Sequence, residues 1–561
     1  MKSLFKVAAI SCLSVLFWTC SDDFLETAPQ GSLNEQSLAD ENGINLALVS
    51  AYARLDGWAE DWGAVPAPWG MSGSNWIFGS MASDDAHKGS EPTDAPTMTQ
   101  IELFQWAPSI PSLESKFAAV YDGVRRANET IVLIGNNTDL NETTRNQLLG
   151  EARFLRGHYH MEGWKMWKNI PFIPEGTTEF RIANDQDIVP NIVDDFTFAA
   201  QNLASEADQD EEGRATSGAA WAMLGRLHML NQDMAAAATA LNNVTGYSLS
   251  DCFHDMFSLG GENGPEKIFS IQASVGDGIP DAHNANFADR LAFPHSGSPF
   301  GCCGFHQPTQ NLVNAYRTDE DGLPDTSNSS DENPTADEPV DPRLDWTIGR
   351  DGIDYLGHGT HEPSWIRDRG WSSEYSPKKF VYAPGEGNTI SWNPAHLNPI
   401  NVPIIRYADV LLMQAEIDVE NNRLEDARAK VNMIRERAGN CAQGEGASPV
   451  ALDDASTRAN YVIGTYDDAW TDQDAAREAV RLERRLELAL EGHRWFDLRR
   501  YGTNYAITTM NAYLDREAQR RPYMQNHNNV EEKHMVYPIP TSAILLSQSE
   551  GEATLRQNPG F

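Results

Sequence analysis

Positive charge is scarce in this sequence. It has 43 Lys and Arg residues against 81 Asp and Glu, a formal net charge of −38 at neutral pH. Phosphate backbones are bound by basic surfaces, so this balance disfavours a nucleic-acid partner. It also favours a neutral ligand over an anionic one. A local basic patch formed by Arg367, Arg369, Lys378 and Lys379 would overturn that preference.

Cysteine is also rare. Six cysteines in 561 residues are too few for a disulfide scaffold. A bond between Cys252 and the adjacent pair Cys302–Cys303 is one open pairing. The spacing CxxC is absent, so no zinc site is expected. The catalytic motifs HExxH, GxSxG and GxxxxGK[ST] are absent too, which disfavours an exported hydrolase.

Long apolar runs are missing. The run Val7–Trp18 follows two lysines and has about a dozen residues, short of the roughly 20 that span a bilayer. It is typical of an export signal. Cys20 follows directly, as in a bacterial lipoprotein processing site, so we expect a signal peptide over 1–19 and a lipidated tether over 20–43. Ordinary secretion with cleavage near Thr19 is the alternative.

Aromatic residues, by contrast, are plentiful, with 15 Trp, 21 Phe and 16 Tyr. This content excludes an intrinsically disordered acidic chain. Apolar residues recur at helical spacing in many segments. The expected helices cover residues 44–55, 113–134, 143–167, 194–205, 215–229, 233–241, 406–420 and 424–438.

Two pairs of these helices are joined by short links, and small residues stand where each pair would cross. Such pairs are typical of tetratricopeptide-like hairpins. We therefore divide the chain into a helical region over 44–250, a loop-rich insert over 251–403 and a C-terminal region over 404–561. Short strands are expected in the insert at 267–272 and 379–382.

Four blocks near the C-terminus carry a family resemblance. They read IIRYADVLLMQAE at 404–416, RLERRLELALEGHRWFDLRR at 481–500, YPIP at 537–540 and QNPGF at 557–561. In this order and position they resemble the SusD/RagB family of outer-membrane nutrient-binding lipoproteins. Further matching segments lie upstream at 121–128 and 151–156.

The resemblance implies a mainly α fold, in which tetratricopeptide-like hairpins form a right-handed scaffold and a loop-rich, mixed second half packs against it. It also implies a non-enzymatic protein without a cofactor, lipid-anchored in the outer membrane and facing the cell exterior. Such proteins lie over a SusC-like TonB-dependent outer-membrane transporter and deliver glycans to it. Some members capture peptides, and peptide capture is the alternative here.

The block at 481–500 is rich in charge. Arg484, Glu487, Glu491, Arg494 and Asp497 recur at helical spacing, which predicts an ion-pair ladder along one helix face. An acid/base pair of Glu487 and Glu491 is disfavoured, because glycosidase carboxylates face one another across a cleft.

Metal signals are weak. His358 and His361 are close in sequence, but a plain loop role explains them more simply. The acidic segment 319–341 begins loosely like a calcium loop and lacks the ligand spacing of an EF-hand. Structural calcium therefore stays a minor alternative, and no metal site is assigned.

A sugar binder needs aromatic platforms flanked by polar groups. Two loop regions, 69–106 and 306–375, offer that combination. Each aromatic residue there has the alternative of packing the loop core. The predicted ligand-binding residues are Trp76, Asp84, Asp85, Lys88, Trp106, Trp365, Trp371 and Tyr375.

Overall fold

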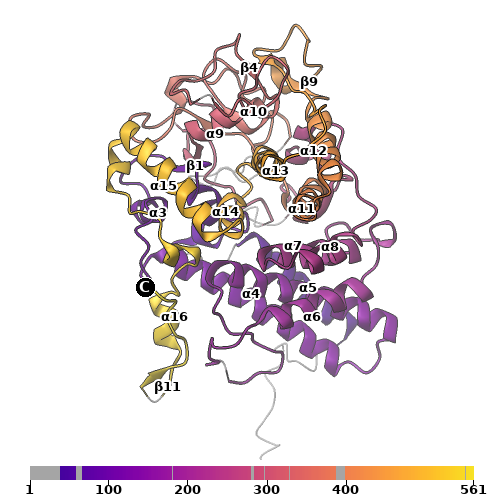
Figure 1. Cartoon of the computed structure of the whole chain (residues 1–561). Helices are drawn as coiled ribbons and strands as arrows, with labels where there is room; N and C mark the ends of the chain where they lie inside the picture. Colours follow the sequence, from indigo (N-terminus) through magenta and orange to yellow (C-terminus); the bar gives the residue numbers. More distant parts are fainter. Residues whose placement is uncertain are drawn as a thin grey trace, which may run out of the picture.

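Figure 1 shows the computed structural model, which is dominated by helices and has only short, two-stranded sheets. It describes residues 38–561 apart from 39, 58–65, 180, 279–283, 296, 328, 387–398 and 550. The signal segment and Cys20 lie outside the described residues. Within those residues, no helix is both long and apolar enough to cross a membrane. The mainly α prediction is confirmed.

The N-terminal helices pack in chain order and form the lower half of the molecule in Figure 1. Their close contacts depend on small residues: a Cβ on Gly225 would lie 2.4 Å from Leu241 Cδ2. Asp233 caps the N-terminus of the helix that ends at Leu241. Its carboxylate accepts a hydrogen bond from the Ala236 amide at 3.0 Å. These helices are α2 (Glu41–Ala53), α4 (Pro111–Asn136), α5 (Glu142–Trp167), α6 (Val189–Asn202), α7 (Ser217–Leu230) and α8 (Met234–Leu241).

The C-terminal third supplies a second helical group. Both predicted hairpins are confirmed, as α7–α8 and as α11–α12. The group comprises α11 (Tyr407–Glu420), α12 (Leu424–Ala438), α13 (Gln473–Leu488), α14 (Arg494–Arg500) and α15 (Thr503–Arg520). The chain ends beyond α16 (Thr541–Leu546) with a hairpin of β11 (Gln548–Ser549) and β12 (Glu552–Ala553).

The expected single helical face over 481–500 is wrong, because the helix stops at Leu488 and a new one starts at Arg494. Leu490 and Gly492 between them have positive φ angles of 65° and 76°. A Cβ on Gly492 would lie 2.1 Å from the Ser74 carbonyl oxygen, so this turn packs directly against the N-terminal half.

The middle of the chain is loop-rich, as predicted. Strand β2 (Lys267–Ile271) pairs antiparallel with β7 (Val402–Arg406), which confirms the first expected strand. The second, at 379–382, is wrong: Phe380 has φ 63° and the Val381 amide donates to the Lys378 carbonyl, which makes a turn. Other short elements are α3 (Pro96–Glu102), α9 (Gln310–Ala315), α10 (Arg343–Thr347), and the antiparallel pair β1 (Ala86–Gly89) and β3 (Phe305–Pro308).

The buried charges of α13 pair with distant segments, whereas the pairs along the helix itself, Arg477 with Asp474 and Arg481 with Glu478, involve exposed carboxylates. Arg406 Nη1 donates to Glu487 at 2.6 Å and to Glu266 at 2.7 Å. Arg343 Nη1 donates to Glu487 at 3.0 Å, and Arg437 also pairs with this carboxylate. Although burial opposes charge on Glu487, the three guanidinium groups hold its pKa below the usual range. We call the following set the buried ion lattice: Glu266, Asp341, Arg343, Lys379, Arg406, Arg435, Arg437, Glu483, Glu487 and Glu491.

The described residues contain four cysteines, which form two disulfides. Cys252 bonds to Cys441 across 189 residues of sequence, and Cys302 bonds to its neighbour Cys303. The pairing of Cys252 with the 302–303 dipeptide is therefore wrong. The long-range bond ties the start of the loop-rich insert to the end of α12, whose last residue is Ala438.

Candidate ligand-binding site

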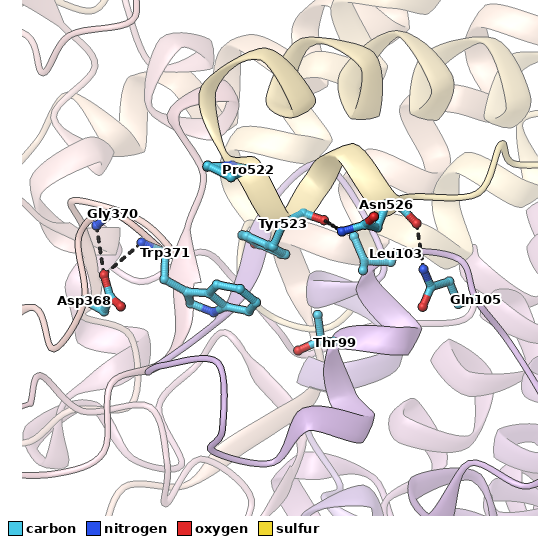
Figure 2. A pocket seen from close by; sticks show the side chains of 9 residues that line it. All are labelled: Thr99, Leu103, Gln105, Asp368, Gly370, Trp371, Pro522, Tyr523 and Asn526. Carbon is cyan, nitrogen blue, oxygen red and sulfur yellow. Dashed lines mark hydrogen bonds between the residues drawn. The ribbon is translucent and has the colours of Figure 1, made fainter.

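Three segments far apart in sequence meet around a cavity of about 790 Å³. They are the end of α3, the loop at 368–371 and the short helix η12 (Pro522–Asn526) (Figure 2). The cavity is lined by Thr99, Leu103, Gln105, Asp368, Gly370, Trp371, Pro522, Tyr523 and Asn526.

A stacked aromatic pair forms one side of the cavity. The ring centroids of Trp371 and Tyr523 lie 4.1 Å apart at an interplanar angle of 23°. Asp368 Oδ1 accepts hydrogen bonds from the amides of Gly370 at 3.1 Å and Trp371 at 2.9 Å, which fixes the loop that carries the indole. Trp371 is half-buried, so part of its ring faces the cavity. We call Trp371 and Tyr523 the aromatic platform.

Amide groups flank this platform. Gln105 Nε2 donates to the Asn526 backbone carbonyl at 2.6 Å, and Asn526 Nδ2 donates to the Tyr523 carbonyl at 3.3 Å. Asn526 is exposed, whereas the Thr99 hydroxyl is buried and makes no hydrogen bond with the part of the chain that the structure describes. An aromatic face beside amide and carboxylate groups that keep spare hydrogen-bonding capacity can stack on the C–H face of a sugar and pair with its hydroxyls.

Four of the predicted aromatic residues lie in the core. Trp76, Trp106, Trp365 and Tyr375 are each at most 7% exposed. Trp106, for example, stacks on Tyr537 with centroids 4.1 Å apart and donates its indole N–H to the Ile101 carbonyl. The expectation that these rings face solvent is wrong, because each is covered by neighbouring chain.

The three predicted charged residues are also buried, and other protein groups satisfy them. Asp84 accepts from Arg494 Nε at 2.8 Å, and Asp85 accepts from Arg485 Nε at 2.8 Å. Burial opposes charge on Asp84, but the two arginines hold its pKa below the usual range. Lys88 Nζ donates to two backbone carbonyls, at 2.7 and 2.5 Å. These contacts correct the expected solvent-facing role.

Trp371 is the predicted residue that the structure places at the cavity. The loop sequences did not indicate its partner Tyr523 or the amides of Gln105 and Asn526. One signal was available: Tyr523 follows Pro522 directly after the α15 pattern ends, so it is an aromatic residue outside a helical period.

No metal centre emerges from the described residues, which contain no group of three or more His, Cys, Asp or Glu side chains placed to hold an ion. His361 contacts Asp351 at 2.9 Å and Ser376 at 3.0 Å. His358 contacts the Tyr382 carbonyl at 2.8 Å. Both histidines are therefore engaged within their own loop region.

A second, larger cavity of about 1250 Å³ runs along α4, the segment 171–182 and α16. Its lining is mostly apolar, and Tyr121 within it donates its hydroxyl to the Pro171 carbonyl at 2.9 Å. The cavity beside Trp371 combines a stacked ring pair with polar groups that keep spare hydrogen-bonding capacity, so it is the stronger candidate for a hydroxyl-rich ligand.

Comparison with known proteins agrees with this architecture. The profile described as "SusD family" matches residues 265–561, more than half of the chain. The chain belongs to the SusD family. A second profile, described as "Starch-binding associating with outer membrane", matches residues 70–229.

Relatives of this SusD-family chain span most of its length. A SusD-like protein of Bacteroides ovatus is 23% identical over 527 residues, which cover 89% of this chain and 82% of the relative. Among solved structures, a SusD-like carbohydrate-binding protein of Bacteroides fragilis has a TM-score of 0.69 at 22% identity, covering 90% and 98% of the two chains. Surface glycan-binding protein A of Bacteroides thetaiotaomicron, in complex with laminarihexaose, has a TM-score of 0.66 at 21% identity, covering 92% and 99%. The SusD-like fold is thereby confirmed.

Proposed function

We propose that this SusD-family chain is a non-enzymatic, cell-surface nutrient-binding lipoprotein. It captures neutral oligosaccharides on the aromatic platform and passes them to a SusC-like TonB-dependent outer-membrane transporter. The stacked pair of Trp371 and Tyr523 beside amides with spare hydrogen-bonding capacity is the observation that carries the proposal. The laminarihexaose complex of a structural relative supports a glycan as the first ligand to test.

The ligand class is tested by calorimetric titration with neutral oligosaccharides, acidic oligosaccharides and mixed peptides, with laminarihexaose in the first set. We expect heat from one class of neutral oligosaccharide and a weaker signal in Asp368→Ala, which loses the carboxylate that orders the Trp371 loop. Heat from peptides alone would replace glycan capture by peptide capture.

Membrane attachment and the transporter are tested in cells. Cys20→Ala should move the protein from the outer-membrane fraction to the soluble fraction, because Cys20 is the proposed lipidation site. The wild-type protein should co-purify with a TonB-dependent barrel after gentle detergent extraction. Unchanged fractionation of Cys20→Ala would contradict the anchor, and absence of any barrel would contradict the delivery role.

A further inference from the structure

Behind the aromatic platform lies a chain of polar contacts that the family comparison does not assign. The Tyr523 hydroxyl donates to Glu102 Oε1 at 2.7 Å. The Tyr523 ring stacks on the indole of Trp371. The Lys88 ammonium also lies near this indole, with Nζ 5.9 Å from the Trp371 ring centroid. The carboxylate of Glu102 thus fixes the orientation of the Tyr523 side chain. The Tyr523 ring in turn packs against the Trp371 indole, which faces the cavity.

Glu102 is itself held from two sides. The Lys88 backbone amide donates to Glu102 Oε2 at 3.1 Å, and His87 Nδ1 lies 2.8 Å from Glu102 Oε1. His87 is fully buried, and its other ring nitrogen, Nε2, lies 3.6 Å from Glu517 Oε2. An imidazole between two carboxylates is favoured in its protonated form.

The charged groups around His87 come from three elements. α3 contributes Glu102, and β1 contributes Lys88, next to His87 itself. Glu517 on α15 also faces two cations, with Arg521 Nε at 3.6 Å and Arg520 Nη1 at 3.9 Å. The Tyr523 hydroxyl also lies 3.2 Å from His87 Nδ1, and the Tyr513 hydroxyl interacts with Glu517 and Glu102.

This environment favours a charged His87 in spite of its burial. Burial alone would lower its pKa, but the hydrogen bond to Glu102 and the nearby Glu517 carboxylate outweigh burial and raise the pKa of His87 above its usual value. Loss of the proton would leave the two carboxylates facing a neutral ring. The contact between His87 and Glu102 would then weaken, since hydrogen bonds are stronger when the donor is charged. Glu102, which accepts from the Tyr523 hydroxyl, would be held less firmly in place.

We propose that His87 and Glu102 are positioning residues of the ligand site: protonated His87 holds Glu102, Glu102 holds Tyr523, and the platform loosens when His87 loses its proton. The inference rests on the proposed function, because its consequence is a sugar affinity that falls at alkaline pH. Its geometry is independent of which sugar binds.

The test follows the platform without any ligand. The protein is labelled with 5-fluorotryptophan and with ¹³C-histidine, and Trp371→Phe and His87→Gln assign the two resonances. We expect the Trp371 fluorine signal to shift in one step with a midpoint above pH 6.5, matching the His87 step. The step should vanish in His87→Gln and persist in the control His527→Gln, whose ring contacts Asp515 and not Glu102.

Tyr523→Phe provides a second variant that keeps the ring and removes the hydroxyl, so it serves even where His87→Gln fails to fold. It too should abolish the Trp371 step. A Trp371 signal that does not respond to pH, or a step that survives in Tyr523→Phe, would overturn the proposal. These outcomes do not depend on sugar binding, so they are distinct from failure of the proposed function. For laminarihexaose, where calorimetry shows binding, we expect affinity to fall about tenfold above the midpoint in the wild type.

Discussion

The buried ion lattice around Glu487 and the cavity beside Trp371 both lie partly in the C-terminal third of the chain, yet they use polar groups in opposite ways. In the lattice, every carboxylate except that of Asp341 is shared by two or more cations, as Glu487 is by three arginines, and all of these groups are buried. At the cavity, Asn526 and Gln105 keep part of their hydrogen-bonding capacity open. Self-satisfied polar groups hold the fold, and groups with spare capacity can recognise a ligand.

The largest expected effect comes from breaking the lattice. Glu487→Gln leaves Arg343, Arg406 and Arg437 short of one buried counter-charge. Removing one partner of a buried pair typically costs about 3–5 kcal/mol. Chemical denaturation should show a loss of that size in the free energy of unfolding. The matched control is Glu129→Gln, whose exposed pair with Arg125 at 2.6 Å should cost about 0.3–0.5 kcal/mol; equal losses in both variants would contradict the distinction.

The next largest effect on stability is expected from removal of the Cys252–Cys441 disulfide. Cys252 and Cys441 close a long loop that contains most of the insert. A native disulfide of this kind contributes about 2–5 kcal/mol, mainly by restricting the unfolded chain. The double variant Cys252→Ala/Cys441→Ala should lose that amount in a denaturation experiment. A change of less than about 0.5 kcal/mol would mean that the bond does not support the fold.

A smaller effect on stability is expected at Asp289, a buried carboxylate that has no paired cation among the described residues, in contrast to Glu487. Burial raises the pKa of Asp289 to about 7, in contrast to the lowered pKa of Glu487. The native state then holds a proton that the unfolded state releases near pH 4, so this group lowers stability as pH rises from about 4 to about 7. Asp289→Asn should therefore be more stable than the wild type at pH 8, by about 1–3 kcal/mol, and similar to it near pH 4. Thermal unfolding at both pH values checks this, and an equal shift at both would contradict it.

The smallest effect on stability is expected at the platform. Trp371 is half-buried and covers little of the core, so Trp371→Ala should cost about 1 kcal/mol or less of folding free energy. Denaturation of Trp371→Ala beside Glu487→Gln measures the contrast directly. A loss at Trp371 as large as that at Glu487 would place the indole among the structural residues.

Sequence patterns predicted the scaffold well and the site poorly, for physical reasons. The hairpins α7–α8 and α11–α12 follow from local apolar periodicity and small residues, as at Gly225. The charges of 481–500 indicated a structural role, but their partners, such as Arg406 and Glu266, come from segments that only the fold brings together. Burial of Trp76 and Trp365 has no local signature, because loop residues are covered by chain that is remote in sequence. The pairing of Trp371 with Tyr523 is remote for the same reason.

The most direct measurement is a calorimetric comparison of two tryptophan variants with the oligosaccharide that gives heat in the wild type. Trp371 stacks on Tyr523 beside the cavity, whereas Trp470 packs edge-on against Tyr466 at 5.2 Å and does not line it. Both indoles are half-buried. We predict that Trp371→Ala lowers affinity more than about tenfold, the loss expected for a central aromatic contact, and that Trp470→Ala leaves it unchanged. Unchanged affinity in Trp371→Ala would contradict the assignment of the ligand site.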